Sequence, residues 1–478
     1  MTSAWMGTAL LIADALIISW LVPRIVVQRR ESAATLAWVL FILFVPLGGA
    51  VLYHFLGTQR LRRKRLLRAR RRAELMPAAE RVAEVLTPHA ATPETAAEDL
   101  ALARAKRLFA IDSSLATKGN EVTILHGDAM FDELERAIAG AEHHVHVEFY
   151  IFHGDATGRA ILERLTERAR AGVEVRFLVD AVGARDLPRR AVAPLVAAGG
   201  KYAQFLPVSP LTRPFSVNFR NHRKIVVIDG KTAFTGGMNV GDEYRGKVTE
   251  LGSWRDTHVV VKGPAALRYQ EIFADDWHFT TGERCTAARY YPEPTRNGTV
   301  TVQVVASGPD QTAEAILRKM FVAITKSESR VWLTTPYFIP DRALTMALQT
   351  AAQRGVDVRL LLPGASDHPL VLWAGRAQYD DLLSSGVRIY EYQSGFLHAK
   401  TMVVDDLWTT LGSANMDRRS FLLNWEANLV ALDRNLASQM GQLFEDDLKN
   451  ALEIRRPRLI GKLEAFREAG SYLLSPLL

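Results

Sequence analysis

The sequence predicts an α/β protein in which two tandem sandwich domains, related by a pseudo-twofold axis, follow an N-terminal transmembrane helical hairpin. Three observations support this fold class: two long apolar stretches at the start, a later alternation of helix and strand patterns, and a duplicated set of motifs. We expect the hairpin over residues 1–57, a basic connecting segment over 58–118, and the two domains over 119–294 and 295–478. A length of 478 residues suits this division, because single cores rarely grow to that size.

The apolar stretches cover residues 4–22 and 33–56, and each is close to the ~20 residues that a helix needs to cross a bilayer core. Pro46, Gly48 and Gly49 can break or kink the second helix, so a shallow re-entrant segment is an alternative to a full crossing. A pair of helices buried in a soluble core is the other alternative. Soluble proteins rarely contain apolar runs of this length, so we favour a membrane hairpin.

Basic residues are distributed unevenly around these stretches. Nine follow the second stretch, whereas three basic residues and one acidic residue lie between the two. The nine are Arg60, Arg62, Arg63, Lys64, Arg65, Arg68, Arg70, Arg71 and Arg72. Because basic loops stay on the cytoplasmic side, we expect the hairpin loop outside and the chain after residue 60 in the cytoplasm. The cluster can also bind an anionic membrane surface, although it can equally serve as a topology signal alone.

Net charge and cysteine content limit the classes of partner and chemistry. A formal net charge of +7 suits an anionic partner, either a membrane surface or a nucleic acid. Cys285 is the single cysteine, which excludes an internal disulfide and a cysteine-cluster metal site. A lone cysteine also fits a catalytic part that works in a reducing compartment.

The chain after residue 118 contains an internal repeat. In each copy a helix end runs into a short β-rich strand, and a second helix leads through glycine into another such strand. The matching segments are 137–152 with 323–338, 171–179 with 354–362, and 272–277 with 443–448. Two similar α/β domains in tandem are therefore expected.

Each copy carries the same polar constellation, at a constant separation of 176 residues (398 − 222 = 176). The first copy contains His222, Lys224, Asp229, Gly236 and Asn239, and the second contains His398, Lys400, Asp405, Gly412 and Asn415. Chance would produce such a set at roughly one site in a million. Histidine and lysine stand two residues apart in an extended segment, so both point to one face. If the domains pack about a pseudo-twofold axis, the histidines, lysines and asparagines converge on one phosphate-sized space.

These residue types match the needs of phosphodiester exchange, which uses a nucleophile, an acid for the departing alkoxide, and donors around the nonbridging oxygens. One histidine can attack phosphorus while the other protonates the leaving oxygen and then activates the incoming hydroxyl. Lys224, Lys400, Asn239 and Asn415 can hold the phosphoryl oxygens. Lysine charge can replace the role of a metal ion, so the scheme requires no metal and no cofactor.

The pattern His-x-Lys-x4-Asp, followed by Gly-Gly/Ser-x-Asn, resembles the phospholipase D superfamily, and its duplication resembles the two-domain members. This resemblance implies that His222 is the nucleophile and His398 the general acid and base, with the reverse assignment as the alternative. It also implies that Asp229 and Asp405 support the site without performing the transfer.

Two acidic residues further along the chain look like the positions that this superfamily uses to orient its histidines. They are Asp256 and Glu426. A carboxylate on the far ring nitrogen would fix the histidine tautomer and stabilise the imidazolium. Surface ion pairing is the alternative for both residues.

Wider sequence context resembles bacterial cardiolipin synthases over essentially the whole chain. The segments that carry this resemblance are 218–225, 236–244, 254–258, 335–338, 412–421 and 423–426. It implies transfer between two molecules of phosphatidylglycerol, giving cardiolipin and glycerol. It also implies a multi-pass protein of the bacterial cytoplasmic (inner) membrane, with its catalytic domains on the cytoplasmic side.

Other functions are less well supported. A phospholipase D hydrolase, or a synthase with another donor or acceptor, is the main alternative. The apolar helices and the lack of a recognised nucleic-acid module disfavour a membrane-tethered nuclease, so we expect no nucleic-acid partner. Two intact motifs disfavour a noncatalytic scaffold. Near the first motif, Arg213, Arg220, Arg223 and Arg245 can bind the phosphate of a second lipid, with solvated basic decoration as an equal alternative.

Overall fold

A computed structural model describes residues 2–27, 32–53, 74–91, 114–207, 218–247, 250, 252–310, 314–458 and 460–475. The chain divides into two compact units. The first contains residues 1–64 and 208–218, and the second contains residues 65–207 and 219–478. The basic cluster at 60–72 and Arg213 lie outside the described residues.

The described part of the first unit contains three helices, α1 (Thr2–Val27), α2 (Ser32–Phe44) and α3 (Pro46–Leu52). Leu21, Ile25, Ile42 and Tyr53 form a small core between them. Many other apolar side chains of these helices are exposed, and Phe44 is 81% exposed.

The second apolar stretch is interrupted where Pro46 predicts a break. Helix α2 ends at Phe44 and α3 begins at Pro46, because proline cannot continue the hydrogen-bond ladder of a helix. The second apolar stretch therefore forms two helices and not one continuous helix. Within the described ranges, no helix combines the length and the apolar character that a membrane crossing requires.

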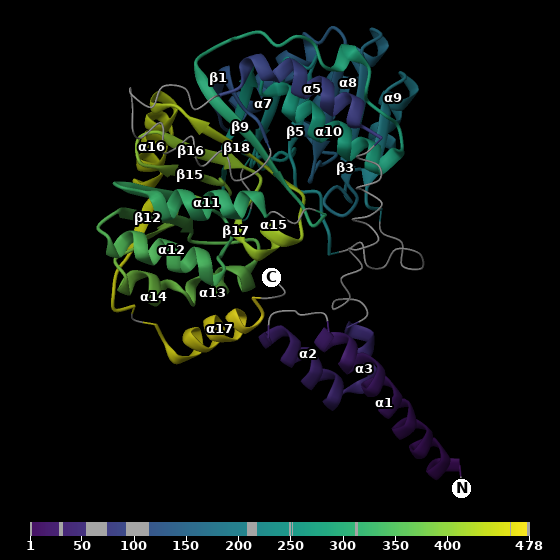
Figure 1. Cartoon of the computed structure of the whole chain (residues 1–478), viewed down its shortest axis with the longest axis vertical. Coiled ribbons are helices and arrows are strands. Elements are labelled where there is room, and N and C mark those ends of the chain that lie inside the picture. Colours follow the sequence, from purple (N-terminus) through teal and green to yellow (C-terminus); the bar gives the residue numbers. More distant parts are fainter. Residues whose placement is uncertain are drawn as a thin grey trace. The chain divides into compact units, whose positions relative to one another are not determined.

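A fifteen-stranded sheet runs through the second unit (Figure 1). Its order is β19-β13-β12-β10-β15-β16-β18-β9-β1-β8-β6-β5-β2-β3-β4. The strands of its first half are β1 (Ala116–Leu125), β2 (His144–Phe149), β3 (Glu174–Asp180), β4 (Lys201–Phe205), β5 (Ile225–Ile228), β6 (Thr232–Gly236) and β8 (His258–Lys262). Those of the second half are β9 (Val300–Ser307), β10 (Arg330–Thr334), β12 (Asp357–Pro363), β13 (Arg388–Tyr392), β15 (Thr401–Val404), β16 (Trp408–Gly412), β18 (Glu426–Leu432) and β19 (Ala451–Ile454).

The strand order shows the internal duplication directly. Reading outward from the central pair β1–β9, the first half runs β8, β6, β5, β2, β3, β4 and the second runs β18, β16, β15, β10, β12, β13, with β19 added at the edge. Strand β1 pairs antiparallel with β9, with Ala116 opposite Gln303. The predicted α/β fold with two tandem domains is confirmed, and the two halves share one continuous sheet.

Helices cover both faces of this sheet. The helices of the first half are α5 (Met76–Leu86), α7 (Asp128–Ala139), α8 (Ala156–Arg170), α9 (Arg189–Ala197) and α10 (Ala266–Thr281), with short 3-10 turns η2 (Thr87–His89) and η4 (Ala288–Tyr290). Those of the second half are α11 (Ala315–Lys326), α12 (Arg342–Gln353), α13 (Pro369–Arg376), α14 (Tyr379–Ser384), α15 (Arg418–Leu422), α16 (Arg434–Leu448) and α17 (Lys462–Leu473).

Three large apolar cores stabilise the second unit. One lies in each half, and a third joins α10 and α16 to strands of both halves, including Val259, Val304 and Leu429. Because this third core is shared, the two domains hold a fixed relation across the junction. That fixed relation is what allows one site to be built from both copies.

Candidate active site

Both histidine motifs lie at the sheet edge where the parallel strands β2 and β10 end. Glu148, near the end of β2, pairs with Ile225 at the start of β5, and Thr334 at the end of β10 pairs with Thr401 at the start of β15. The segments that precede β5 and β15 therefore emerge at the edge of the sheet where α/β proteins place their ligands.

Each motif is tied by its backbone to the other domain. The backbone N–H of His222 donates to the carbonyl of Trp425 at 2.9 Å, and the N–H of His398 donates to the carbonyl of Arg255 at 2.7 Å. Two-stranded pairings support these contacts: β7 (Trp254–Arg255) runs beside β14 (Phe396–Leu397), and Asn221 bridges to Trp425. The site therefore exists only when both halves are folded together.

The two histidines open on one cavity of about 210 Å³. Its lining residues are Tyr150, Ile151, Arg220, His222, Asn239, Tyr244, Trp254, Tyr337, Ile339, Asp367, His368, Val371, His398, Asn415, Asp417, Arg419 and Asn424. The predicted convergence of histidines and asparagines thus occurs in the structure, whereas neither lysine of the two motifs is part of this lining.

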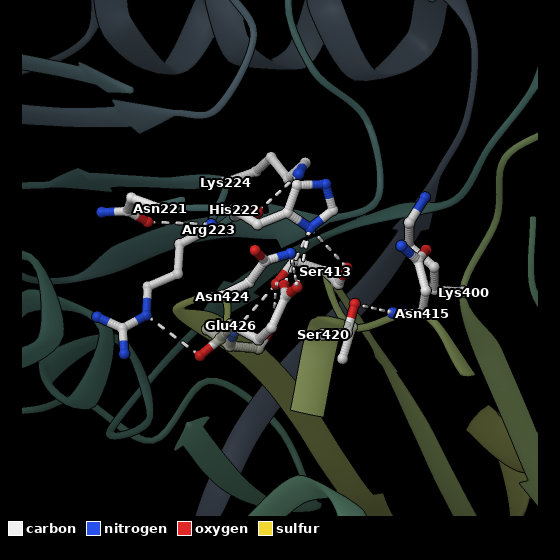
Figure 2. A network of polar contacts seen from close by, with 12 residues as sticks. Asn221, His222, Arg223, Lys224, Lys400, Ser413, Asn415, Ser420, Asn424 and Glu426 are labelled. Carbon is white, nitrogen blue, oxygen red and sulfur yellow. Dashed lines mark hydrogen bonds and ion pairs between the residues drawn. The ribbon is translucent and has the colours of Figure 1, made fainter. Parts of the chain in front are cut away.

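Glu426 holds His222 from the opposite domain (Figure 2). The Nδ1 atom of His222 lies 3.0 Å from Oε2 and 3.1 Å from Oε1 of this buried carboxylate. Ser413 Oγ donates to the same carboxylate at 2.5 Å, and Asn424 Nδ2 donates at 3.3 Å. Because Nδ1 faces a carboxylate, Nε2 is the ring nitrogen left for chemistry.

Asp256 plays the equivalent part for His398, again across the domain junction. Its Oδ2 lies 2.6 Å from Nδ1 of His398, while its Oδ1 accepts the backbone N–H of Thr257 at 2.7 Å. The structure therefore crosses the pairs: the first-domain aspartate serves the second-domain histidine, and the second-domain glutamate serves the first-domain histidine.

Burial and neighbouring charges set the protonation states of these dyads. Burial lowers the pKa of His222 despite the opposing charge of Glu426, and burial with the nearby Lys400 charge lowers the pKa of His398 to about 4. Burial alone would raise the pKa of Glu426 and Asp256, but cationic neighbours outweigh it and hold both below their usual values. Both dyads are therefore neutral imidazoles beside ionised carboxylates at neutral pH.

The motif lysines lie beneath the histidines. Lys224 Nζ donates to the carbonyl of His222 at 2.6 Å, and Lys400 Nζ donates to the carbonyl of His398 and lies 3.0 Å from its Nδ1. Burial lowers the pKa of Lys224 well below its usual value and lowers that of Lys400 to about 8. Lys400 therefore stays largely protonated at neutral pH and places a positive charge close to His398, whereas burial disfavours the charged form of Lys224 beneath His222.

The two motif asparagines differ in their contacts. Asn239 is fully engaged, because its Nδ2 donates to Tyr244 and its Oδ1 accepts the backbone N–H of Ile151. Asn415 lines the same cavity, and its buried Oδ1 has no hydrogen-bond partner among the described residues. This asymmetry makes Asn415 the better placed of the two to bind a ligand through its amide.

The motif aspartates are not in the cavity. Asp229 follows β5 with a φ of +54°, and its carboxylate accepts the backbone N–H groups of Glu142, His143 and His144 at 2.8 to 2.9 Å. Asp405 has the same φ and accepts backbone N–H groups at residues 328–330. Neither aspartate lines the cavity, and each anchors the turn that enters β2 or β10.

The cavity has two unlike walls. On the side of His222, Arg220 is buried and joined to Asp180 at 2.9 Å, while its Nε and Nη2 have no partner among the described residues. His398 is instead surrounded by aromatic rings, whose centroids lie 5.3 to 6.4 Å from its own. These rings belong to Trp254, Tyr244, Phe396 and Tyr337. The two histidines therefore have unlike surroundings: Arg220 and the ring of Tyr150 lie on the side of His222, and four aromatic rings surround His398.

Two of the arginines proposed to bind a second phosphate serve other purposes. Arg223 is buried, donates to the carbonyls of Glu426 and Ser307, and pairs with Asp276. Arg245 pairs with three carboxylates on α7. A phosphate role is therefore wrong for these two, whereas Arg220 does line the cavity.

Several lining residues lie outside the motifs and were not predicted. Asp367, whose Oδ1 accepts the Tyr337 hydroxyl at 2.9 Å, and the adjacent His368 come from the loop before α13. Arg419 and Asn424 come from the segment that leads into Glu426. Asn424 and Tyr337 stood inside segments that carried the family resemblance, which was the available signal. Asp367 and His368 had no such signal.

Comparisons with known proteins agree with this architecture. The family model described as "Cardiolipin synthase, PLD-like domain" matches residues 134–277 and 320–448. The cardiolipin synthase of Geobacillus kaustophilus is 37% identical over 464 residues, covering 94% of this chain and 90% of the relative.

The chain belongs to the cardiolipin synthase family. Cardiolipin synthase 2 of Staphylococcus epidermidis is similar as well, at 35% identity over 95% of this chain and 94% of its own length. The predicted resemblance to bacterial cardiolipin synthases of the phospholipase D superfamily is thus confirmed, and the protein is a phosphatidyltransferase of the phospholipase D type.

Two further matches concern the N-terminal segment and the fold of the two-domain unit. A model described as "Phospholipase_D-nuclease N-terminal" matches residues 15–57. Among solved structures, the phosphatidylserine synthase of Haemophilus influenzae superposes with a TM-score of 0.58 at 14% identity, over 78% of this chain and 97% of that one. The latter shows the shared fold of the two-domain unit.

Proposed function

We propose that this member of the cardiolipin synthase family transfers the phosphatidyl group of one phosphatidylglycerol to a second, giving cardiolipin and glycerol. The observation that carries the proposal is the pair of buried carboxylate–histidine dyads, each crossing between domains, that open on one cavity. Such a pair provides one nucleophile and one proton-transfer group for a single phosphodiester.

In the first step the Nε2 lone pair of His222 attacks phosphorus. Glu426 holds the proton on Nδ1, so that Nε2 is unprotonated. The bond from phosphorus to the glycerol oxygen breaks, and that oxygen takes a proton from Nε2 of His398. The products are phosphatidyl-His222, neutral His398 and free glycerol.

In the second step a primary hydroxyl of another phosphatidylglycerol attacks the phosphorus of the phosphohistidine. Its proton passes to Nε2 of His398, and the phosphorus–nitrogen bond breaks to return the lone pair to His222. The cycle ends with cardiolipin and a protonated His398, so each group is restored.

The free site holds His398 neutral, because its pKa is about 4. Its protonated form must therefore be favoured by the substrate, and the anionic phosphodiester supplies the required negative charge next to the ring. Asp256 stabilises the imidazolium once it forms.

Phosphoryl oxygens would be held by the charges and donors around the cavity. Arg220 has unpartnered guanidinium nitrogens and lines the cavity, and Asn415 lines the same cavity, where its amide NH2 group can donate to a phosphoryl oxygen. Lys400 adds buried positive charge behind His398, and Lys224 places its amino group in the equivalent position behind His222. Among the described residues no group of three or more histidine, cysteine or acidic side chains is arranged to hold a metal ion.

We further propose that residues 1–57 anchor the protein in the bacterial cytoplasmic membrane, with the catalytic unit on the cytoplasmic side. Support comes from the apolar stretches, the exposed apolar side chains of α1 and α2, and the basic cluster that follows them. An anchored site meets both lipid substrates at their membrane concentration.

The test is product analysis of the purified full chain with labelled phosphatidylglycerol in mixed micelles. Wild-type protein should yield cardiolipin and glycerol in equal amounts, and His222→Ala and His398→Ala should yield neither. Phosphatidic acid as the sole product would identify a hydrolase and overturn the proposal. A matched control, His143→Ala, changes an exposed histidine outside the site and should leave the products unchanged.

A further inference from the structure

The C-terminal helix α17 (Lys462–Leu473) buries polar side chains and exposes apolar ones. The side chains that face the protein are polar: Glu468 and Ser471 are buried, and Glu468 pairs with Arg458 at 2.6 Å. Arg467 lies over the ring of Trp373 on α13, with 5.7 Å between its guanidinium carbon and the ring centroid. The helix is therefore held to the domain by polar contacts and stacking.

The apolar side chains of α17 point outward instead. Leu463, Phe466, Leu473 and Leu474 follow helical spacing and form one stripe, which we call the α17 stripe. Their exposed fractions are 64%, 75%, 80% and 43%. A buried ion pair on the inner side fixes the orientation, so the stripe cannot be rotated inward without breaking that pair.

Helix α17 packs against a helix whose first turn lines the active-site cavity. Helix α17 packs along α13, as Figure 1 shows. Helix α13 begins directly after His368, and both His368 and Val371 line the cavity. Between them Leu370 is 44% exposed, so the helix that lines the cavity also carries an exposed apolar side chain.

Charge around the stripe points to an anionic surface. Residues 455–474 contain five basic side chains, Arg455, Arg456, Arg458, Lys462 and Arg467, against two acidic ones, Glu464 and Glu468. The buried pair of Arg458 and Glu468 cancels, and the remaining basic side chains of this segment are exposed, with Arg455 near Glu453 at 3.7 Å. An exposed apolar stripe flanked by basic residues is the pattern of a helix that lies in a membrane interface.

We propose that the α17 stripe, with Leu370, docks the catalytic unit onto an anionic lipid bilayer and sets the cavity entrance against the membrane surface. This proposal rests on the proposed function, because it assumes that both substrates are lipids of the bilayer to which the stripe binds. It adds a second membrane contact, separate from the N-terminal segment, that shortens the path of a lipid headgroup into the cavity.

The first test places a fluorophore on the stripe of the full chain. Cys285 is buried, so Phe466→Cys can be labelled selectively with an environment-sensitive dye. In proteoliposomes of phosphatidylglycerol and phosphatidylethanolamine, its emission should shift to the blue and be quenched by nitroxide-bearing acyl chains. A dye at Arg136→Cys, on an exposed site of α7, should show neither effect. A dye at position 466 that behaves like the dye at position 136 overturns the proposal. A blue shift of the emission that occurs without lipid and grows with protein concentration also overturns it, because the stripe would then bind a second copy of the chain.

The second test compares two forms of the same substrate. Leu463→Glu combined with Leu473→Glu should lower turnover of phosphatidylglycerol in bilayers about tenfold, because apolar burial at the interface is lost. Turnover of a monomeric short-chain phosphatidylglycerol should be unchanged. Val196→Glu, at an exposed apolar residue of α9, is the matched control and should change neither rate. Equal losses on both substrates overturn the docking proposal, whereas a wild type that makes no cardiolipin from either substrate contradicts the proposed function and leaves the dye measurement valid.

Discussion

Replacing Glu426 with glutamine tests the cross-domain dyad most sharply. The substitution keeps the shape of the side chain but removes the negative charge that lies 3.0 Å from Nδ1 of His222. A glutamine can also present its amide N–H to Nδ1, which would move the ring proton to Nε2 and block the nucleophile.

The expected loss follows from the geometry. Two unit charges 3.0 Å apart attract by about 5 kcal/mol at an effective dielectric constant of about 20. Only part of a positive charge develops on His222 as its Nε2 bonds to phosphorus, so we expect a loss of about 3–5 kcal/mol. This corresponds to a decrease in kcat on the order of 10²–10⁴.

The assay is the initial rate of glycerol release from labelled phosphatidylglycerol, with circular dichroism to establish that the variant is folded. Ser413→Ala is the matched control, because it removes one hydrogen bond to the same carboxylate and leaves the charge in place. It should cost at most about tenfold. A Glu426→Gln enzyme within threefold of wild type would refute the reasoning.

Four further outcomes are expected. Asp405→Ala should lower the free energy of unfolding by about 2–4 kcal/mol, because backbone N–H groups lose their acceptor. The kcat per folded molecule should stay within a few-fold of wild type, and a loss of kcat without a loss of stability would contradict an anchoring role. Turnover should decline above pH 8 as Lys400, with a pKa of about 8, loses its charge, and a pH–rate profile that stays level to pH 10 would exclude this. The pKa of His398 is about 4 when folded and about 6.5 when unfolded, so the unfolded state binds more protons in this interval. The contribution of His398 to stability should therefore be complete above pH 6.5 and fall by about 1.4 kcal/mol per pH unit toward pH 4, and denaturant titration of His398→Gln should show a fall that is shallower by this amount. Arg220→Gln should reduce turnover by about 10- to 100-fold through lost phosphate binding, whereas Arg245→Gln should remain near wild type; similar effects in both would remove Arg220 from the site.

Sequence was most informative where a pattern occurs twice. The duplicated helix and strand segments predicted tandem α/β domains, and the structure matches them strand for strand along one sheet. A repeat constrains the fold because both copies must satisfy the same packing pattern.

Pairing across the junction was beyond sequence reasoning. Asp256 and Glu426 were expected to orient histidines, but nothing local shows that each serves the histidine of the other domain, 142 and 204 residues away. Sequence distance carries no information about which of two equivalent sites a carboxylate reaches. Only the pseudo-twofold packing decides it.

Charged residues without a motif were the least predictable. Arg220, Arg223 and Arg245 look alike in sequence, yet one lines the cavity, one is buried against Asp276, and one pairs with α7. Asp367 is brought into the cavity by a loop that no motif marks. Such positions depend on side-chain burial, which periodicity does not resolve for isolated residues.

The central claim is that phosphatidyl transfer passes through a covalent bond to His222. The most direct measurement uses His398→Ala with a phosphatidyl ester of p-nitrophenol, whose leaving group needs no proton, followed by alkaline quench and peptide mass spectrometry. The account predicts that a phosphatidyl adduct accumulates on the peptide that contains His222, because the base for the second step is missing. An adduct on another residue, or nitrophenol release with no adduct at any time point, would contradict it.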